Sequence, residues 1–273
     1  MSRSRRGVLV PTMLALGFAF LYVPILSMVV FSFNASKLVT VWDAAHSPTL
    51  HWYRALMGNE QILQAAWLSL RVGLMTATGA AVLGTFIGLV LARHRRFRGR
   101  ALFQVLANAP LVMPEVITGL SLLLLFVALE QAVGWPSGRG LTTLTLAHIT
   151  FSMSYVAVIV QSRLVTFDGS LEEAAMDLGA RPLTVFFRVT LPLILPAVAS
   201  GWLLAFTLSW DDLVISQFVA GPGSTTLPMV VFSKVRLGVS PDVNALATLM
   251  LGVVAMGVMV STWVMRRKKS EAR

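Results

Sequence analysis

The chain has 273 residues, of which 56% are hydrophobic and 12% are charged, and its mean hydropathy is +0.77. Soluble domains carry about 25% charged residues and disordered chains are poor in apolar ones, so both classes are excluded. The chain contains no cysteine, which excludes disulfides, thiolate metal ligands and a cysteine nucleophile. The composition indicates an all-α integral membrane protein.

Six long apolar runs predict six transmembrane helices in a single domain that covers residues 1–273. A helix needs about 20 mostly apolar residues to cross a bilayer. The predicted spans are about 8–33, 64–92, 104–129, 141–162, 191–212 and 243–265. The first run is too long for the apolar region of a signal peptide, so we expect it to be a retained span.

A seventh uncharged run, residues 213–233, is not expected to be a span. It contains the turn-forming sequence Gly-Pro-Gly-Ser-Thr-Thr-Leu-Pro at 221–228, which cannot form one continuous helix. Non-helical backbone is excluded from contact with lipid. We therefore expect a loop or a re-entrant segment between the fifth and sixth spans.

The basic residues predict that both termini are cytoplasmic, because basic residues concentrate on the inner side of membrane proteins. The outer segments then hold only Lys37, Arg54, Arg139, Lys234 and Arg236. The inner segments hold Arg3, Arg5, Arg6, Arg93, Arg95, Arg96, Arg98, Arg100, Arg163, Arg181, Arg188, Arg266, Arg267, Lys268, Lys269 and Arg273. Topology therefore explains the net charge of +10, and nucleic-acid binding is not expected.

The inner segment 163–188 is predicted to form two short helices. Ser170 and Glu173 have the spacing of a capping box at the start of the first helix. Gly179 can take the left-handed conformation that ends a helix, and Pro182 suits the first turn of the next one.

An apolar stripe runs along the first of these helices, formed by Leu171, Ala174, Ala175 and Leu178 at helical spacing. Two interpretations follow from the residues alone. The segment either joins two spans as a surface hairpin, or it presents a ridge that fits a groove on another protein.

Glu173-Ala174-Ala175, three residues, Gly179, nine residues and then Val189-Thr190-Leu191-Pro192 resemble the EAA loop of ABC importer permeases, in which isoleucine usually stands at the position of Val189. The resemblance implies a type I ABC importer permease fold. It also implies that the segment couples to a cytosolic ATP-binding subunit. The implied coupling residues are Glu172, Glu173, Ala174, Ala175, Asp177, Gly179, Leu191 and Pro192.

The same resemblance implies the partners of the chain. They are a dimer of the ATP-binding subunit, a second permease subunit that is favoured to be a different chain, and a periplasmic binding protein. The chain has no Gly-Lys-Ser/Thr phosphate loop, so it is expected to be a non-catalytic subunit without a cofactor.

Four further segments, 33–42, 109–119, 210–215 and 221–228, look like those of polyamine permeases and most like those of putrescine importers. The resemblance implies a periplasmic polyamine-binding protein and a bacterial inner-membrane location. Spermidine or another small cationic solute is the alternative substrate, because the binding protein largely selects the substrate in such importers.

Three acidic residues are candidates for a cation path, because ionisable groups within spans are costly and usually functional. Glu115 either contributes to the path, faces a polar contact between helices, or caps the helix that restarts after Pro114. Asp211 and Asp212 either form an outer gate or end the fifth span as solvated residues, and they point about 100° apart on a helix.

Spans three and five share a pattern of two prolines and a glycine, Pro110-Leu-x-x-Pro114-x-Val-x-x-Gly119 and Pro192-Leu-x-x-Pro196-x-Val-x-x-Gly201. Each proline removes a backbone hydrogen bond, so we expect a bend in both helices. Chance similarity between apolar helices is the alternative.

The alternatives to a transport subunit are a membrane-embedded enzyme and a self-sufficient channel or secondary carrier. A membrane-embedded enzyme needs a nucleophile with a base or a metal site, but Gly-x-Ser-x-Gly is absent and the histidines lack metal-ligand spacing. A channel or secondary carrier has no use for a protruding coupling helix, so co-purification with an ATPase discriminates between the two readings.

Overall fold

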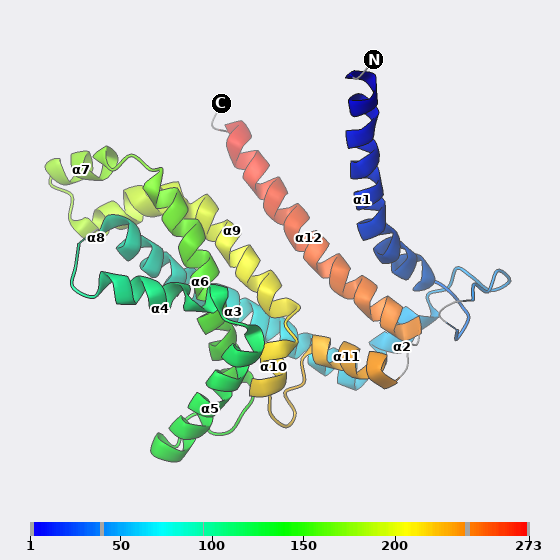
Figure 1. The fold of residues 1–273 in the computed structure, drawn as a ribbon. Coiled ribbons are helices and arrows are strands. Elements are labelled where there is room, and N and C mark those ends of the chain that lie inside the picture. Colours follow the sequence, from blue (N-terminus) through cyan, green and yellow to red (C-terminus); the bar gives the residue numbers. More distant parts are fainter. Residues whose placement is uncertain (1–2, 39–40, 95, 238–240, 272–273) are drawn as a thin grey trace. The chain divides into compact units, whose positions relative to one another are not determined.

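The computed structural model describes residues 3–38, 41–94, 96–237 and 241–271, which contain helices and no strand (Figure 1). The chain forms two compact units. One comprises Met1–Leu63 and Val231–Met256, and the other Gln64–Val230 and Gly257–Arg273.

Among the described residues, six helices are long and apolar enough to cross a membrane, as predicted. They cover Leu9–Phe31, Glu60–Arg93, Glu115–Val133, Leu141–Val165, Pro182–Trp210 and Pro241–Val260. Of the basic residues that predict the orientation, Arg95 and Arg273 lie outside the described residues.

The first unit contains α1 (Arg3–Phe31), α2 (His51–Met57), most of α11 (Leu227–Leu237) and the beginning of α12 (Pro241–Glu271). The segment between α1 and α2 folds around Asn34, which is fully buried. The Asn34 side chain accepts a hydrogen bond from the Asp43 amide at 2.9 Å and donates one to the Val41 carbonyl at 2.7 Å. The Trp52 indole donates to the Asn34 carbonyl at 2.7 Å. These hydrogen bonds join Asn34 to Val41, Asp43 and Trp52.

The second unit contains most of α3 (Glu60–Arg93), with α4 (Arg100–Val112), α5 (Glu115–Val133), α6 (Leu141–Val165), α7 (Ser170–Asp177), α8 (Pro182–Val185), the π-helix η1 (Phe186–Thr190), α9 (Leu191–Trp210) and α10 (Val214–Val219). Glycines let α3 and α9 approach α6 closely. A Cβ at Gly84 of α3 would lie 2.6 Å from Cβ of Val156 in α6, and one at Gly201 of α9 would lie 3.0 Å from Cγ1 of the same valine. Small residues at such crossings permit tight packing of membrane helices.

The third predicted span differs from the structure. The expected helix over 104–129 is divided into α4 and α5, because Met113 and Pro114 are extended, with ψ angles of 135° and 136°. Proline disfavours the helical conformation of the residue before it, so Met113 leaves the helix. The helix long enough to cross is α5, which begins at Glu115.

The second copy of the proline pattern behaves differently. Helix α9 continues through Pro196, and the widened turn η1 lies just before Pro192. Because α9 packs extensively along α6, tertiary contacts hold this helix together despite its prolines. At the first copy a break between α4 and α5 replaces the predicted bend, whereas at the second copy α9 is one helix.

As predicted, the run 213–233 is not one continuous helix. It nevertheless consists mainly of helical residues, which belong to α10 and α11. The helices α10 and α11 are separated by a turn in which Gly223 has a φ of 74°. In the same turn the Ser224 hydroxyl oxygen accepts the Gly221 amide at 2.7 Å. Turn chemistry at the Gly-Pro-Gly-Ser sequence therefore ends one helix without preventing two short ones.

Candidate functional site

The inner segment 163–188 forms the predicted helix, glycine turn and helix, as α7 and α8. Gly179 has a φ of 86°, and Pro182 lies in the first turn of α8. The predicted capping box is wrong, because Gly169 is the capping residue of α7 and makes no side-chain hydrogen bond. The Ser170 amide instead donates to the Asp168 carboxylate at 3.0 Å, and this bond lowers the pKa of Asp168. An ionised Asp168 is favourable beside the N-terminus of α7.

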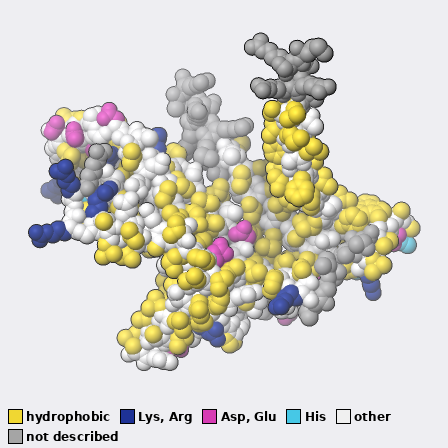
Figure 2. Space-filling view, viewed as in Figure 1, with side chains coloured by type: hydrophobic (Ala, Val, Ile, Leu, Met, Phe, Trp, Pro, Cys, Tyr) yellow, Lys and Arg dark blue, Asp and Glu magenta, His cyan; other side chains and the backbone are white. Residues whose placement is uncertain are grey.

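Helix α7 has an outward face that is largely exposed among the described residues. Leu171 is 49% exposed, Leu178 is 90% exposed, and Ala174 between them is exposed. Glu173 and Asp177 are exposed as well. Figure 2 shows acidic and basic side chains gathered over the end of the unit that carries α7 and α8. The predicted ridge is thus an exposed apolar surface edged by charge.

The opposite face of α7 is held to the helix bundle through Glu172. One carboxylate oxygen of Glu172 lies 3.0 Å from Nε of Arg93, and the other accepts the Thr190 hydroxyl at 2.6 Å. The Arg93 guanidinium also lies 5.4 Å from the centre of the Phe167 ring. Sequence reasoning missed Arg93 and Thr190 as contacts of α7, because Arg93 belongs to the arginine cluster assigned to topology. Of the three remaining candidates, Ala175 and Leu191 are half-buried and Pro192 is exposed at the start of α9.

A small cavity of about 170 Å³ adjoins this contact. Its lining residues are Leu89, Arg93, His94, Glu172, Met176, Pro182, Val185, Phe186 and Thr190. They come from α3, α7, α8 and η1, except His94, which directly follows α3. The predicted inner segments after α3 and after α6 therefore meet at one end of this unit.

Predicted outer segments meet each other in the same way. A Cβ at Gly221 would lie 2.2 Å from the carbonyl oxygen of Arg139, so the turn after α10 touches the loop between α5 and α6. The grouping of inner with inner and outer with outer segments agrees with the alternation of the predicted spans.

The three acidic candidates have different environments. Glu115 is the first residue of α5 and is exposed, and Asp211 follows α9 and is also exposed. One turn after Glu115, Gly119 packs against Phe218 of α10. Figure 2 shows acidic side chains among hydrophobic ones in the middle of this face, next to α9 and α10.

Asp212, in contrast, is buried in a polar network. Its side chain is 8% exposed and lies 3.1 Å from Nε2 of His148, whose own side chain is 2% exposed. Nδ1 of His148 lies 2.8 Å from the Ser209 hydroxyl. The Ser216 amide donates to Asp212 at 2.8 Å, so the carboxylate also caps α10. The network joins α6, α9 and α10, and a lone histidine in a span gave no sequence signal for it.

A serine, a histidine and an aspartate in contact resemble a hydrolytic triad, which bears on the enzyme alternative. Ser209 is 6% exposed and His148 is 2% exposed. A nucleophile needs space for a substrate carbonyl beside its hydroxyl, and this burial leaves none. The arrangement is a buried structural network. Within the described residues, no group of three His, Cys, Asp or Glu side chains could hold a metal ion.

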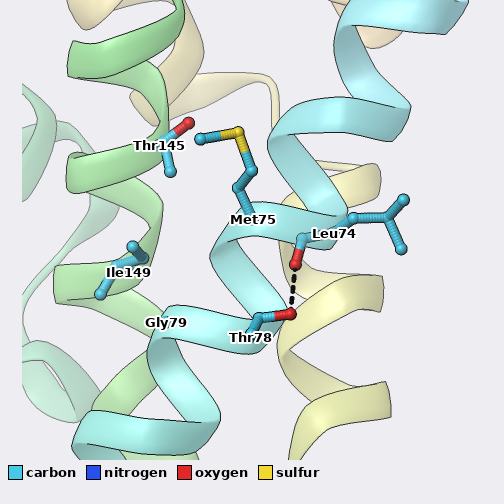
Figure 3. Close-up of a pocket in the computed structure, with 6 residues that line it drawn as sticks. All are labelled: Leu74, Met75, Thr78, Gly79, Thr145 and Ile149. Carbon is cyan, nitrogen blue, oxygen red and sulfur yellow. Dashed lines mark hydrogen bonds between the residues drawn. The ribbon is translucent and has the colours of Figure 1, made fainter.

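A groove of about 470 Å³ lies between α3 and α6 (Figure 3). It is lined by Leu74, Met75, Thr78, Gly79, Thr145 and Ile149, with Leu74, Met75, Thr78 and Gly79 from α3 and the other two from α6. The Thr78 hydroxyl donates to the Leu74 carbonyl at 2.8 Å, so it is already engaged. The lining carries no charge and does not suit a cation.

Comparison with known proteins places these features in a family. The family described as "Binding-protein-dependent transport system inner membrane component" matches residues 84–268. The "Putrescine transport system permease protein PotI" of Escherichia coli (strain K12) is 57% identical over 258 residues, which are 94% of this chain and 91% of that protein. The "Spermidine/putrescine transport system permease protein PotC" of the same strain is 41% identical over 254 residues, 93% of this chain and 92% of that protein. These relatives confirm the resemblance to polyamine permeases.

The fold has solved counterparts. A chain from a bacterial ABC transporter involved in the import of the acidic polysaccharide alginate superposes with a TM-score of 0.72, covering 98% of each chain at 16% identity. At this identity the likeness concerns the fold, and it confirms the six-helix ABC importer permease fold. The family match and the two relatives together show that the chain belongs to the inner membrane components of binding-protein-dependent transport systems.

Proposed function

We propose that the chain is the permease subunit of an ATP-driven polyamine importer, and that putrescine is its substrate. The observation that carries the substrate class is the 57% identity to a putrescine permease over 94% of the chain. Spermidine is the second candidate, because a relative named for both polyamines is 41% identical.

As a member of its family, the chain is a multi-pass protein of the inner membrane and a non-catalytic transport subunit. We propose the finer assignments. Both termini are cytoplasmic, and the partners are a dimer of cytosolic ATP-binding subunits, a second and different permease subunit, and a periplasmic polyamine-binding protein. ATP hydrolysis takes place on the ATP-binding subunits.

The proposed coupling surface is the outward face of α7. Leu178 projects from the end of this helix with 90% of its surface exposed, and Leu171 lies on the same face. Exposed apolar residues on a helix suit a hydrophobic groove on a partner. Glu173 and Asp177 at the edge of this face can select a basic rim on the partner.

The proposed cation path uses Glu115 and Asp211, which are exposed, with Asp212 fixed beside Asp211. A diamine that crosses the membrane loses hydration, and carboxylates can replace part of it. Gly119 brings the first turns of α5 against α10, and the two aspartates immediately precede α10, so the path candidates come from adjoining elements.

Substrate class is tested by uptake into proteoliposomes that contain the chain with its ATPase, second permease and binding protein. The proposal expects ATP-dependent uptake of labelled putrescine that excess spermidine inhibits weakly. Preferred uptake of spermidine would replace putrescine with the second candidate, and uptake of neither would refute the polyamine assignment.

Coupling is tested with a matched pair of glycine variants. Gly179 after α7 and Gly134 after α5 have φ angles of 86° and 71°, so a leucine at either position carries similar backbone strain, about 1–2 kcal/mol. Gly179→Leu is expected to abolish ATPase binding and uptake while the chain still inserts, and Gly134→Leu is expected to retain ATPase binding. Equal ATPase binding by both variants would refute the coupling role of the α7 turn. Glu173→Lys is expected to act like Gly179→Leu.

A further inference from the structure

We propose that Arg93 and Thr190 are positioning residues for coupling: through Glu172 they fasten α7 to the ends of α3 and α9, so that a movement of α7 is transmitted to these spans. The inference rests on the proposed coupling role of α7. It assigns Glu172 to an internal contact, whereas the resemblance to the EAA loop groups it with the residues that meet the ATPase.

The two faces of α7 support this division. Glu172 and Ala175, three residues apart, are half-buried toward the bundle, while Leu171, Ala174 and Leu178 are exposed. A helix of eight residues is too short to be stable in water by itself. Leu171 and Leu178 point outward and Met176 lines the small cavity beside the contact, so the polar attachment of α7 to its own unit runs through Glu172.

The charges at this contact suit the helix ends that carry them. Arg93 is the last residue of α3, where the helix dipole favours a cation, and Glu172 lies in the first turn of α7, where it favours an anion. Their side chains are 26% and 17% exposed, so the pair is only partly screened by solvent.

Thr190 extends the contact to the fifth span. It is 3% exposed, and it is the last residue of the π-helix η1, immediately before α9. Its hydroxyl donates to Glu172 at 2.6 Å. π-Helical turns are rare and often occur at functional sites, and this one places Thr190 against α7. Arg93 also contacts Phe167, which follows α6, so the cluster of Arg93, Glu172 and Thr190 joins α7 to three spans.

Rigid transmission predicts a specific defect. Without the cluster, α7 can still bind the ATPase through its outward face, but its movement is no longer followed by α3 and α9. ATP hydrolysis then continues while transport falls. A purely stabilising contact would instead reduce hydrolysis and transport together, in proportion to the amount of assembled complex.

The experiment uses the full reconstituted complex with its binding protein, and measures uptake and ATP hydrolysis in the same proteoliposomes. Arg93→Met and Thr190→Val are compared with Arg96→Ala, an exposed arginine in the same inner segment. We expect uptake per ATP to fall about tenfold in Arg93→Met, near the low end of typical coupling between sites, and less in Thr190→Val. Arg93→Lys, which keeps the charge, is expected to recover part of the loss, and Arg96→Ala to match the unmodified chain.

Hydrogen exchange provides a second measurement that does not depend on transport. The amides of 167–180 are expected to exchange faster in Arg93→Met and Thr190→Val, because α7 opens locally when the contact through Glu172 is lost. In Arg96→Ala their exchange rates are expected to be unchanged. An unchanged ratio of uptake to ATP hydrolysis in assembled Arg93→Met and Thr190→Val complexes would overturn the inference, as would an equal loss in Arg96→Ala. An ATPase that fails to bind even the unmodified chain would instead refute the proposed coupling function.

Discussion

The buried contact between His148 and Asp212 gives a prediction with a definite size. His148→Leu removes the ring that faces Asp212 Oδ2 at 3.1 Å, and the carboxylate, 8% exposed, keeps the Ile215 and Ser216 amides and the Ser216 side chain as hydrogen-bonding neighbours. Breaking a buried charged contact from one side costs about 3 kcal/mol, because the other charge loses its main partner. We therefore expect the free energy of unfolding to fall by about 3 kcal/mol.

A double-mutant cycle separates this cause from simple loss of volume. Asp212→Asn keeps an oxygen to cap α10 but removes the charge, so adding it to His148→Leu should reduce the total loss to about 1 kcal/mol. The free energies are measured by denaturant unfolding of the purified chain in detergent. Asp211→Asn, at the exposed neighbour, serves as the control and should change stability little. Additive losses in the cycle would refute the reasoning, since they would mean that His148 and Asp212 do not interact.

The remaining predictions concern the turn after α10, the coupling surface and the cation path. Gly221→Ala should lower the free energy of unfolding by about 3 kcal/mol, because its Cβ would lie 2.2 Å from a backbone oxygen of the α5–α6 loop; equal stability in the same denaturant assay would contradict that contact. Leu171→Asp with Leu178→Asp should abolish co-purification of the ATPase while leaving membrane insertion intact, since a charge disrupts an apolar docking surface; retained co-purification would exclude the ridge. Glu115→Gln and Asp211→Asn should each reduce putrescine uptake about tenfold without loss of assembly, as expected for one lost hydrogen bond to a charged group, and unchanged transport kinetics would remove these acids from the path.

Sequence reasoning predicted the spans well, because lipid leaves few alternatives to a long apolar helix. The predictions were wrong where contacts with neighbouring helices decide whether a helix continues. Pro114 and Pro196 occupy equivalent places in a repeated pattern, yet the first follows a break between helices and the second lies within α9. The difference comes from packing against α6, which the local pattern does not contain.

Only those features of the candidate site that depend on local residues were predicted. The glycine turn after α7 and its exposed apolar face follow from local residue chemistry, and both are present. The capping box is not, because Asp168 takes the Ser170 amide. The partners of Glu172 and of Asp212 are distant in the sequence, and Arg93 and His148 give no local indication of the carboxylate that each one meets.

Cross-linking from Leu178 tests the central claim most directly, namely that the outward face of α7 is where the ATPase binds. The chain has no cysteine of its own, so Leu178→Cys introduces a single reactive position on a side chain that is 90% exposed. In the assembled complex we expect a short bifunctional reagent to join this cysteine to the ATPase, and Ser137→Cys, in the loop between α5 and α6, to give no such product. Leu178→Cys that stays unlinked in a complex containing the ATPase would contradict the account.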